Sequence, residues 1–389
     1  MAKCDTSSVV AWLVDGARSA RSSELVLEEM CTRLCACGMP LWRVEVFVRT
    51  LHPEVVGRRF RWQQGDEVSV STTTFDLPLE HGQSFIEHLC AQRIPIHTHP
   101  GADDRWLDFP RIQELWAEGV TDLLAAPLIF TEGDAHAAIF TTREVSGFSE
   151  EQIAGLEALI NPLARIAEVR ALQRTATNLL DTYVGHGAGE RILSGQIRRG
   201  HTESIHAAIW LSDMRGFTTL SDHVPPPAMI GILNQYFDCQ VPNILRHGGE
   251  VLNFMGDGLL AMFPIENPSD ERRMCRAALA AGLEARARIA ELRPSDVDGV
   301  KKIRFGLALH MGDVLFGNIG GGNRLDFTCI GPAVNLAARL EKIAAELGRT
   351  IVTSSAFAQH FDTELTALGD FAVRGFGARQ QVFGLIDEA

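Results

Sequence analysis

The stretch Ile205-His-Ala-Ala-Ile-Trp-Leu-Ser-Asp-Met-Arg-Gly-Phe-Thr218 decides the fold of the second half of the chain. Its first part is an apolar run that predicts a buried strand over residues 205–211. Asp213 follows the strand, and Gly216 comes three residues later, where the missing side chain lets backbone amides approach a ligand. The stretch therefore predicts a strand that delivers one carboxylate to a ligand-binding turn.

The elements after this strand predict a mixed α/β domain of the α+β kind. They are a helix, a hairpin, a second helix and a strand, over residues 228–246, 250–255 with 259–263, 270–292 and 303–310. With the first strand they give the order βαββαβ, which is the ferredoxin-like arrangement. A further strand over residues 324–330 leads into a helix that begins near Pro332.

A second carboxylate lies at the tip of the predicted hairpin, in Met255-Gly-Asp-Gly258. Neighbouring strands of the predicted sheet would bring Asp213 and Asp257 together. Two carboxylates beside open backbone amides suit two Mg²⁺ ions that carry a triphosphate, because magnesium completes its shell with phosphate and water. A Gly-Asp-Gly hairpin is by itself only a turn, so the prediction depends on both motifs.

The third motif is Phe327-Thr-Cys-Ile-Gly-Pro-Ala-Val-Asn-Leu-Ala-Ala-Arg339. Asn335 and Arg339 are four residues apart on the predicted helix, so they share a face and can reach the same phosphate region. The neighbouring apolar residues are explained as core. From the residues alone, these motifs predict a site for two-metal phosphoryl chemistry.

In this order and at this spacing, the motifs resemble those of class III adenylate and guanylate cyclases over about residues 200–385. The resemblance implies two divalent ions, Mg²⁺ or Mn²⁺, held by Asp213 and Asp257 with Met214 in the same metal site. It implies that Asn335 orients the ribose and that Arg339 stabilises the charge that grows on the α-phosphate.

The resemblance also implies substrate contacts and an assembly. Phe217 and Thr218 would lie on the substrate beside the first metal residue, and Arg374 on its terminal phosphates. The active site would lie at a head-to-tail homodimer interface, with the metal residues from one chain and Asn335 and Arg339 from the other. One chain alone would then be inactive.

Two positions bear on the base of the nucleoside triphosphate. Members that use ATP usually carry Lys four residues before the second metal Asp, and Asp or Thr seven residues before the helix Asn. Thr328 fits this pattern and Asn253 departs from it. Asn offers a donor and an acceptor, so Asn253 could donate to adenine N1 while Thr328 accepts from the amine, or it could pair with guanine or a pyrimidine. We expect an adenylate cyclase that makes cyclic AMP; a guanylate or pyrimidine nucleotide cyclase and a catalytically weak nucleotide-binding sensor are the alternatives.

The first part of the chain alternates helices and strands. Helices are predicted over residues 24–37, 83–92 and ahead of Val120, and strands over 42–50, 68–74 and the hairpin 122–142. That hairpin, followed by Gly147-Phe-Ser-Glu-Glu and a long helix, resembles the second half of a GAF domain, over about residues 8–170. The resemblance implies a pocket for an unidentified small molecule. His97 and His99 could be metal ligands, but two histidines alone do not make a site and we expect a solvated loop.

A long helix is predicted to connect the two parts. Its apolar residues recur close to a heptad spacing, which predicts a dimer seam; they are Ile153, Leu156, Ile160, Leu163, Val169, Leu172, Ala176 and Leu179. Pro162 is expected to kink or restart the helix. The predicted organisation is a GAF-like sensory domain over residues 1–150, a helical dimerising connector over 151–200 and a catalytic domain over 201–389, with the first domain regulating the last.

Composition excludes several function classes. The formal net charge of −13 argues against a nucleic-acid binder. No apolar run approaches the roughly 18 residues of a membrane span and no signal sequence is evident, so we expect a cytoplasmic protein without membrane contact. The eight scattered cysteines predict reduced thiols. There is no phosphate-binding loop of the kinase or NTPase kind, and Gly317-Asn-Ile-Gly-Gly-Gly322 is interpreted as a flexible hairpin at a dimer interface.

Overall fold

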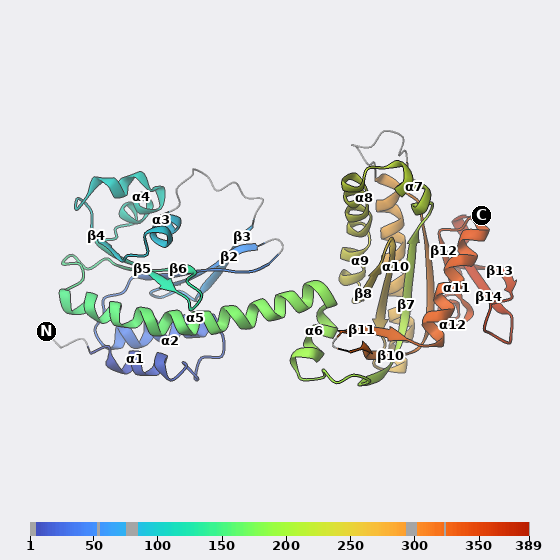
Figure 1. Ribbon diagram of the computed structural model, residues 1–389, viewed down its shortest axis with the longest axis horizontal. Helices are drawn as coiled ribbons and strands as arrows, with labels where there is room; N and C mark the ends of the chain where they lie inside the picture. The colour runs from blue at the N-terminus through green and yellow to red at the C-terminus, as the bar shows by residue number, and fades with distance from the viewer. Residues whose placement is uncertain (1–4, 53–54, 75–84, 293–301, 323, 389) are drawn as a thin grey trace. The chain divides into compact units, whose positions relative to one another are not determined.

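The computed structural model describes residues 5–52, 55–74, 85–292, 302–322 and 324–388 (Figure 1). The chain divides into two compact units, Met1–Leu179 and Leu180–Ala389. The division falls inside the segment predicted as the connector. Each unit has its own sheet and its own core.

The first unit is built on a six-stranded antiparallel sheet with the order β3-β2-β1-β6-β5-β4. Its strands are β1 Arg43–Arg49, β2 Val55–Gln63, β3 Ser69–Thr74, β4 Ile96–Thr98, β5 Asp122–Ile129 and β6 Ala135–Thr142. Strand β2 was missing from the prediction. Its register with β1 pairs Val46 with Phe60 and Val44 with Trp62, whose side chains are buried.

Helices cover both faces of this sheet. They are α1 Ser7–Val14, α2 Ser23–Ala36, α3 Phe85–Gln92, α4 Pro110–Ala117 and α5 Glu150–Val184, with a 3₁₀ turn at Asp104–Asp108. Figure 1 shows α1, α2 and α5 on one face and α3 and α4 on the other, and a separate apolar cluster lies under each group. The resemblance of this unit to a GAF domain stays a prediction.

Helix α5 differs from the expectation at Pro162, because it runs without a restart through that residue. Leu156, Leu159 and Leu163 are buried in the core of the first unit on both sides of the proline, and this packing outweighs one lost backbone hydrogen bond. The first part of the predicted seam therefore belongs to the unit's own core. Farther along, Val169 is 53% and Leu172 is 64% exposed.

The second unit confirms the predicted βαββαβ core. Its strands are β7 Thr202–Met214, β8 Glu250–Met255, β9 Gly258–Pro264, β10 Phe305–Gly321, β11 Arg324–Ile330, β12 Ile351–Ser354, β13 Leu365–Phe371 and β14 Gln380–Leu385. The four central strands follow the order β10-β7-β9-β8 and are antiparallel. Strands β12, β14 and β13 extend the sheet beyond β10, and β11 pairs with the end of β10.

Most helices of the second unit lie over two large apolar clusters. The helices are α6 His186–Leu193, α7 Phe217–His223, α8 Pro226–Asp238, α9 Val241–Arg246, α10 Glu271–Glu291, α11 Pro332–Leu347 and α12 Ser355–Ala358, with 3₁₀ turns at Pro268–Asp270 and Ile386–Glu388. Helices α8, α9 and α10 pack with Trp210 and Leu259, while α6 and α11 pack with Ile209 and Leu260. Because successive strand residues point to opposite faces, these two clusters lie on opposite sides of the sheet. Helix α11 also packs on a third, smaller cluster beside β12 and β14.

The helix predicted over residues 228–246 is in fact two helices. Pro242 has no N–H to donate to a carbonyl in the preceding turn, so α8 ends at Asp238 and α9 begins at Val241, with this proline in its first turn.

Within the described ranges, the structure contains no helix that is both long and apolar enough to cross a bilayer. The seven cysteines it describes are free thiols.

Candidate metal and nucleotide site

Asp213 lies near the end of β7, opposite Gly306 on β10. Strand β7 is buried from Ala207 to Ser212, so the apolar run fixes where the carboxylate emerges. Met214 is 4% exposed and its side chain packs in the core. Any metal contact from Met214 would therefore come from its backbone carbonyl.

Asp257 lies in the tight turn between β8 and β9. Gly256 has φ +67°, a left-handed conformation that favours glycine. A Cβ atom at Gly258 would lie 3.5 Å from Oδ1 of Asp213, so the turn approaches the end of β7 closely. The neighbouring carboxyl of Asp257 raises the pKa of Asp213, so the two side chains lie close together. The structure thus brings together the two carboxylates that the sequence paired.

The closeness of the two carboxyls favours the protonated form of Asp213. Burial and the neighbouring carboxyl of Asp257 raise the pKa of Asp213 from 3.8 to about 7, and Arg215 acts in the opposite direction. A divalent ion between the carboxylates would relieve the same repulsion. No set of three or more His, Cys, Asp or Glu side chains forms a metal site in the described part of the chain. Two carboxylates with open positions suit Mg²⁺ or Mn²⁺, which fill their shells with phosphate and water.

We expect the metal-free protein to lose stability as the pH rises toward neutrality. The folded-state pKa of Asp213 is above its ordinary value, so its stabilising contribution is complete below about pH 3.8 and is lost as the pH rises through about 7. Asp213→Asn cannot ionise and should escape this loss, so without divalent ions its melting temperature should rise relative to that of the wild type across this window. At pH 8, Mg²⁺ should raise the melting temperature of the wild type and leave that of Asp213→Asn unchanged. A difference that stays constant with pH would contradict the raised pKa of Asp213.

An ion pair that the sequence did not indicate lies behind the carboxylates. Nη1 of Arg215 is 2.6 Å from Oε1 of Glu341 on α11, and the two side chains are 20% and 8% exposed. Gly306 makes room for the pair, because a Cβ atom there would lie 1.9 Å from Nη2 of Arg215. The pair joins the turn after β7 to α11. Its partners are 126 residues apart, and no local pattern connects them.

Asn335 and Arg339 lie on the outward face of α11. Leu336, Ala337 and Leu340 are buried on the opposite side of this helix, while Asn335 is exposed and Arg339 half-buried. Among the residues described, neither side chain has an ion-pair or hydrogen-bond partner. The structure does not bring them into contact with Asp213 or Asp257 of the same chain.

The two positions expected to read the base lie on neighbouring segments. Nδ2 of Asn253, on β8, donates to Oδ2 of Asp326 at 3.5 Å, and Asp326 lies on β11 two residues before Thr328. Thr328 is half-buried opposite Gly317. Asp326 was missed from the sequence, because its relation to Asn253 depends on contact between β8 and β11. Residues 317–321 form one side of a hairpin, with β11 as the other.

The other residues expected to contact the substrate lie on separate segments of the second unit. Phe217 begins α7 and packs partly against the core, and Thr218 beside it is exposed. Arg374 is exposed in the connection between β13 and β14. In the first unit, Nε2 of His97 lies 2.9 Å from Oδ1 of Asp122, so this histidine is not simply solvated as expected but hydrogen bonds to a buried carboxylate.

Comparison with known proteins supports the reading of the second unit. Residues 201–386 match the family model of the adenylate and guanylate cyclase catalytic domain. The chain is 28% identical to adenylate cyclase 1 of Rhizobium meliloti, in an alignment that covers 50% of this chain and 30% of the relative. It is also 28% identical to an adenylate cyclase of Anabaena cylindrica, in an alignment that covers 40% of this chain and 31% of the relative. It aligns with the crystal structure of the adenylyl cyclase CyaB from P. aeruginosa at 26% identity and a TM-score of 0.42, over 48% of this chain and 96% of that one. The chain spans about a third of the length of these curated relatives.

Proposed function

We propose that this chain, whose residues 201–386 match the family model of the adenylate and guanylate cyclase catalytic domain, converts ATP to 3′,5′-cyclic AMP and pyrophosphate. The observation that carries the proposal is the half-buried pair of Asp213 and Asp257 at the meeting point of β7 and the β8–β9 turn. Two neighbouring half-buried carboxylates form a site where divalent ions can bind a triphosphate.

In the proposed mechanism the two carboxylates hold Mg²⁺ or Mn²⁺. The bound ions supply the acidity of the 3′-hydroxyl and neutralise charge on the triphosphate. Asp213 and Asp257 fix where the α-phosphate lies, so that the hydroxyl can attack in line. Phe217 and Thr218 flank this position at the start of α7.

The second half of the site comes from α11. Arg339 stabilises the charge that develops on the α-phosphate, and Asn335 orients the ribose. These side chains face outward with no partner among the described residues, which supports their acting on a substrate bound mainly by a second copy of the chain. The active protein is then a homodimer with two equivalent sites, and Arg374 contacts the terminal phosphates.

ATP is the proposed substrate because relatives of this domain are named adenylate cyclases and because Thr328 can accept a hydrogen bond from the amine of adenine. One observation favours GTP as a second candidate. When Nδ2 of Asn253 donates to Asp326, Oδ1 of Asn253 and the Asp326 carboxylate remain as acceptors for the base, beside the second N–H of Nδ2. Guanine, with donors at N1 and N2, matches two acceptors.

Exchanging Asn253 for lysine should shift the enzyme toward ATP. The Asn253→Lys ammonium can pair with Asp326 and donate to adenine N1, while it offers guanine no acceptor. We expect the ratio of kcat/KM for ATP over GTP to rise by about tenfold or more. Steady-state rates with both triphosphates measure this, with Asn253→Gln as the control that keeps the amide. An unchanged ratio in Asn253→Lys would show that this position does not contact the base.

The proposed regulation assigns the first unit a sensory role and the α5–α6 segment a role in dimerisation. Exposed Val169 and Leu172 on α5 are available to a second chain. The proposed location is the cytoplasm.

The direct test of the function is to incubate the full chain with ATP, GTP, CTP or UTP in Mg²⁺ or Mn²⁺ and to quantify cyclic products by mass spectrometry. Cyclic AMP that disappears in Asp257→Ala would support the proposal. Another cyclic nucleotide would keep the mechanism and replace the substrate. A folded dimer that makes no cyclic product from any triphosphate would refute the enzymatic proposal.

A further inference from the structure

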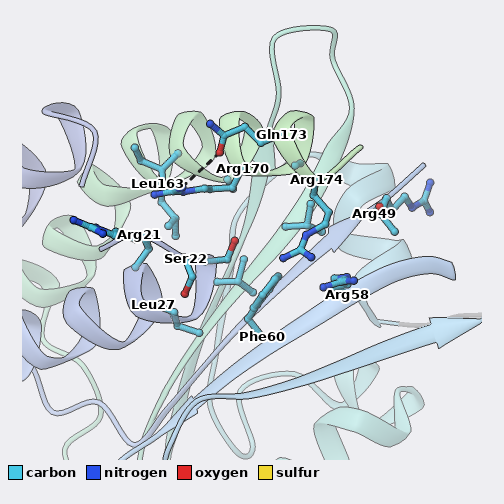
Figure 2. Close-up of a pocket in the computed structure, with 18 of the residues that line it drawn as sticks. Arg21, Ser22, Leu27, Arg49, Arg58, Phe60, Leu163, Arg170, Gln173 and Arg174 are labelled. Carbon is cyan, nitrogen blue, oxygen red and sulfur yellow. Dashed lines mark hydrogen bonds between the residues drawn. The ribbon is translucent and has the colours of Figure 1, made fainter. Parts of the chain in front are cut away.

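The first unit contains a cavity of about 280 Å³ between its sheet and two of its helices (Figure 2). Strands β1 and β2 form one side, and α2 and α5 form the other. All of its lining residues lie between Arg21 and Thr177, so the cavity belongs to this unit alone. Its volume is at the lower end of the roughly 300–1,000 Å³ typical of small-molecule sites.

The polar lining of the cavity is strongly cationic. Five arginines line it and no acidic residue does; they are Arg21, Arg49, Arg58, Arg170 and Arg174. This concentration stands out because the chain as a whole carries a formal charge of −13. Across the described ranges, none of these five guanidinium groups forms an ion pair.

Two of the arginines lie close enough to repel each other. Figure 2 shows Arg58 and Arg174 near one another, from β2 and α5. Burial and the charge of Arg174 lower the pKa of Arg58, while Glu24 acts in the opposite direction. Nε of Arg58 is buried without a hydrogen-bond partner, as is Oγ1 of Thr50 in the same lining. Buried donors without partners cost free energy that a bound anion would recover.

A third arginine is already fixed in position. Nη2 of Arg170 donates to the carbonyl of Ala20 at 2.8 Å, and Nη1 to Oε1 of Gln173 at 3.5 Å. Arg170 therefore closes the cavity between α5 and the chain ahead of α2. Arg58 and Arg174, for which no such side-chain hydrogen bond is found in the described residues, are the arginines most available to a ligand.

The rest of the lining is apolar. Val46 and Phe60 contribute from the sheet, Leu27 from α2, and Leu163 and Ile166 from α5. Val46, Phe60, Leu27 and Leu163 are buried. A ligand that fills this space must therefore combine an anionic group with a compact apolar body.

We propose that this cavity is a binding site for a small amphipathic anion, with a carboxylate, sulfonate or phosphate group between Arg58 and Arg174 and an apolar body against Phe60 and Leu27. Such a ligand would bridge α5 and β2. The site is independent of the nucleotide site and stands whether or not the second unit is an active cyclase.

Anilinonaphthalene sulfonate is a suitable probe, and N-phenylnaphthylamine is its neutral counterpart with the same rings. In a fluorescence titration we expect the full chain to bind the sulfonate at one saturable site per chain. Its affinity for the sulfonate should be higher than its affinity for the neutral compound. Arg58→Gln and Arg174→Gln should each lower the affinity for the sulfonate at least about tenfold, which corresponds to about 1.4 kcal/mol of binding free energy. Their affinity for the neutral compound should not change.

Arg18→Gln is the matched control, because it removes the same charge from the same unit at an exposed position paired with Asp15; it should bind both probes like the wild type. Ala167→Phe should fill the cavity and weaken both probes. Circular dichroism and the unfolding midpoint verify that each variant is folded. Equal sulfonate affinity in folded wild type and Arg58→Gln, or undiminished binding of both probes to folded Ala167→Phe, would overturn the proposal.

Discussion

Asp257→Ala and Arg339→Ala should each abolish most cyclic nucleotide formation, while an equimolar mixture of the two variants should recover activity. Arg339→Ala removes a group that acts on transition-state charge, which costs about a hundredfold to a thousandfold in rate. Asp257→Ala removes one of only two carboxylates and should cost at least as much. If the site combines Asp213 and Asp257 of one chain with Asn335 and Arg339 of another, a mixed dimer contains one intact site. Random pairing of the variants should then restore about a quarter of wild-type activity.

The control for this complementation is a mixture of Asp257→Ala with Asp213→Ala. Both lesions lie in the same half of the site, so every dimer in that mixture has two damaged sites. The readout is cyclic product per chain after the variants have been mixed and allowed to exchange. Recovery confined to the first mixture would support the two-chain site. Inactivity of both mixtures, with subunit exchange verified by labelled chains, would show that the two halves do not combine across a dimer.

Gly306→Ala should markedly destabilise the second unit by separating a buried ion pair. The added Cβ would lie 1.9 Å from Nη2 of Arg215 and 2.7 Å from Oε1 of Glu341, so the ion pair must separate. Glu341 is 8% exposed and would remain buried without its partner. Breaking a buried pair in this way costs about 3–5 kcal/mol. Urea unfolding monitored by circular dichroism measures the loss.

Gly321→Ala is the control for this prediction because it adds the same group to the same strand, where nothing lies within 4 Å of the new Cβ. It should change the free energy of unfolding little. Glu341→Gln in the Gly306→Ala background should restore part of the stability, because it removes the buried carboxylate that has lost its Arg215 partner. If Gly306→Ala unfolds at the wild-type urea concentration, the pair contributes little to this fold.

The local parts of the site could be predicted from sequence because each lies within one short stretch. The apolar run before Asp213 fixed a strand, the glycines around Asp257 fixed a turn, and the spacing of Asn335 and Arg339 fixed a helix face. The predicted sheet order then placed the two aspartates together. Each step used a periodicity or a turn preference that acts over a few residues.

What the sequence did not indicate depends on contacts between distant segments. Strand β2 carries Arg58, Arg59 and Arg61 and looks too charged for a strand, yet β1 and β3 pair with it on both sides. The cavity gathers arginines from β1, β2, α5 and the segment ahead of α2, and this cationic lining forms only when these segments pack together. The contact of Asn253 with Asp326 is equally remote along the chain.

Strand β10 holds the second unit together in a way that matters for how it opens. At Leu307–Leu309 it is paired with β7 on one side and β12 on the other, and at Leu315–Gly317 with β7 and β11. Amide protons in these two stretches should be among the last to exchange with deuterated solvent, because no single neighbouring strand can fray and release them. One stretch adjoins Gly306 and the carboxylates, and the other adjoins Thr328. The metal end and the base end of the site should therefore lose their order in the same cooperative event.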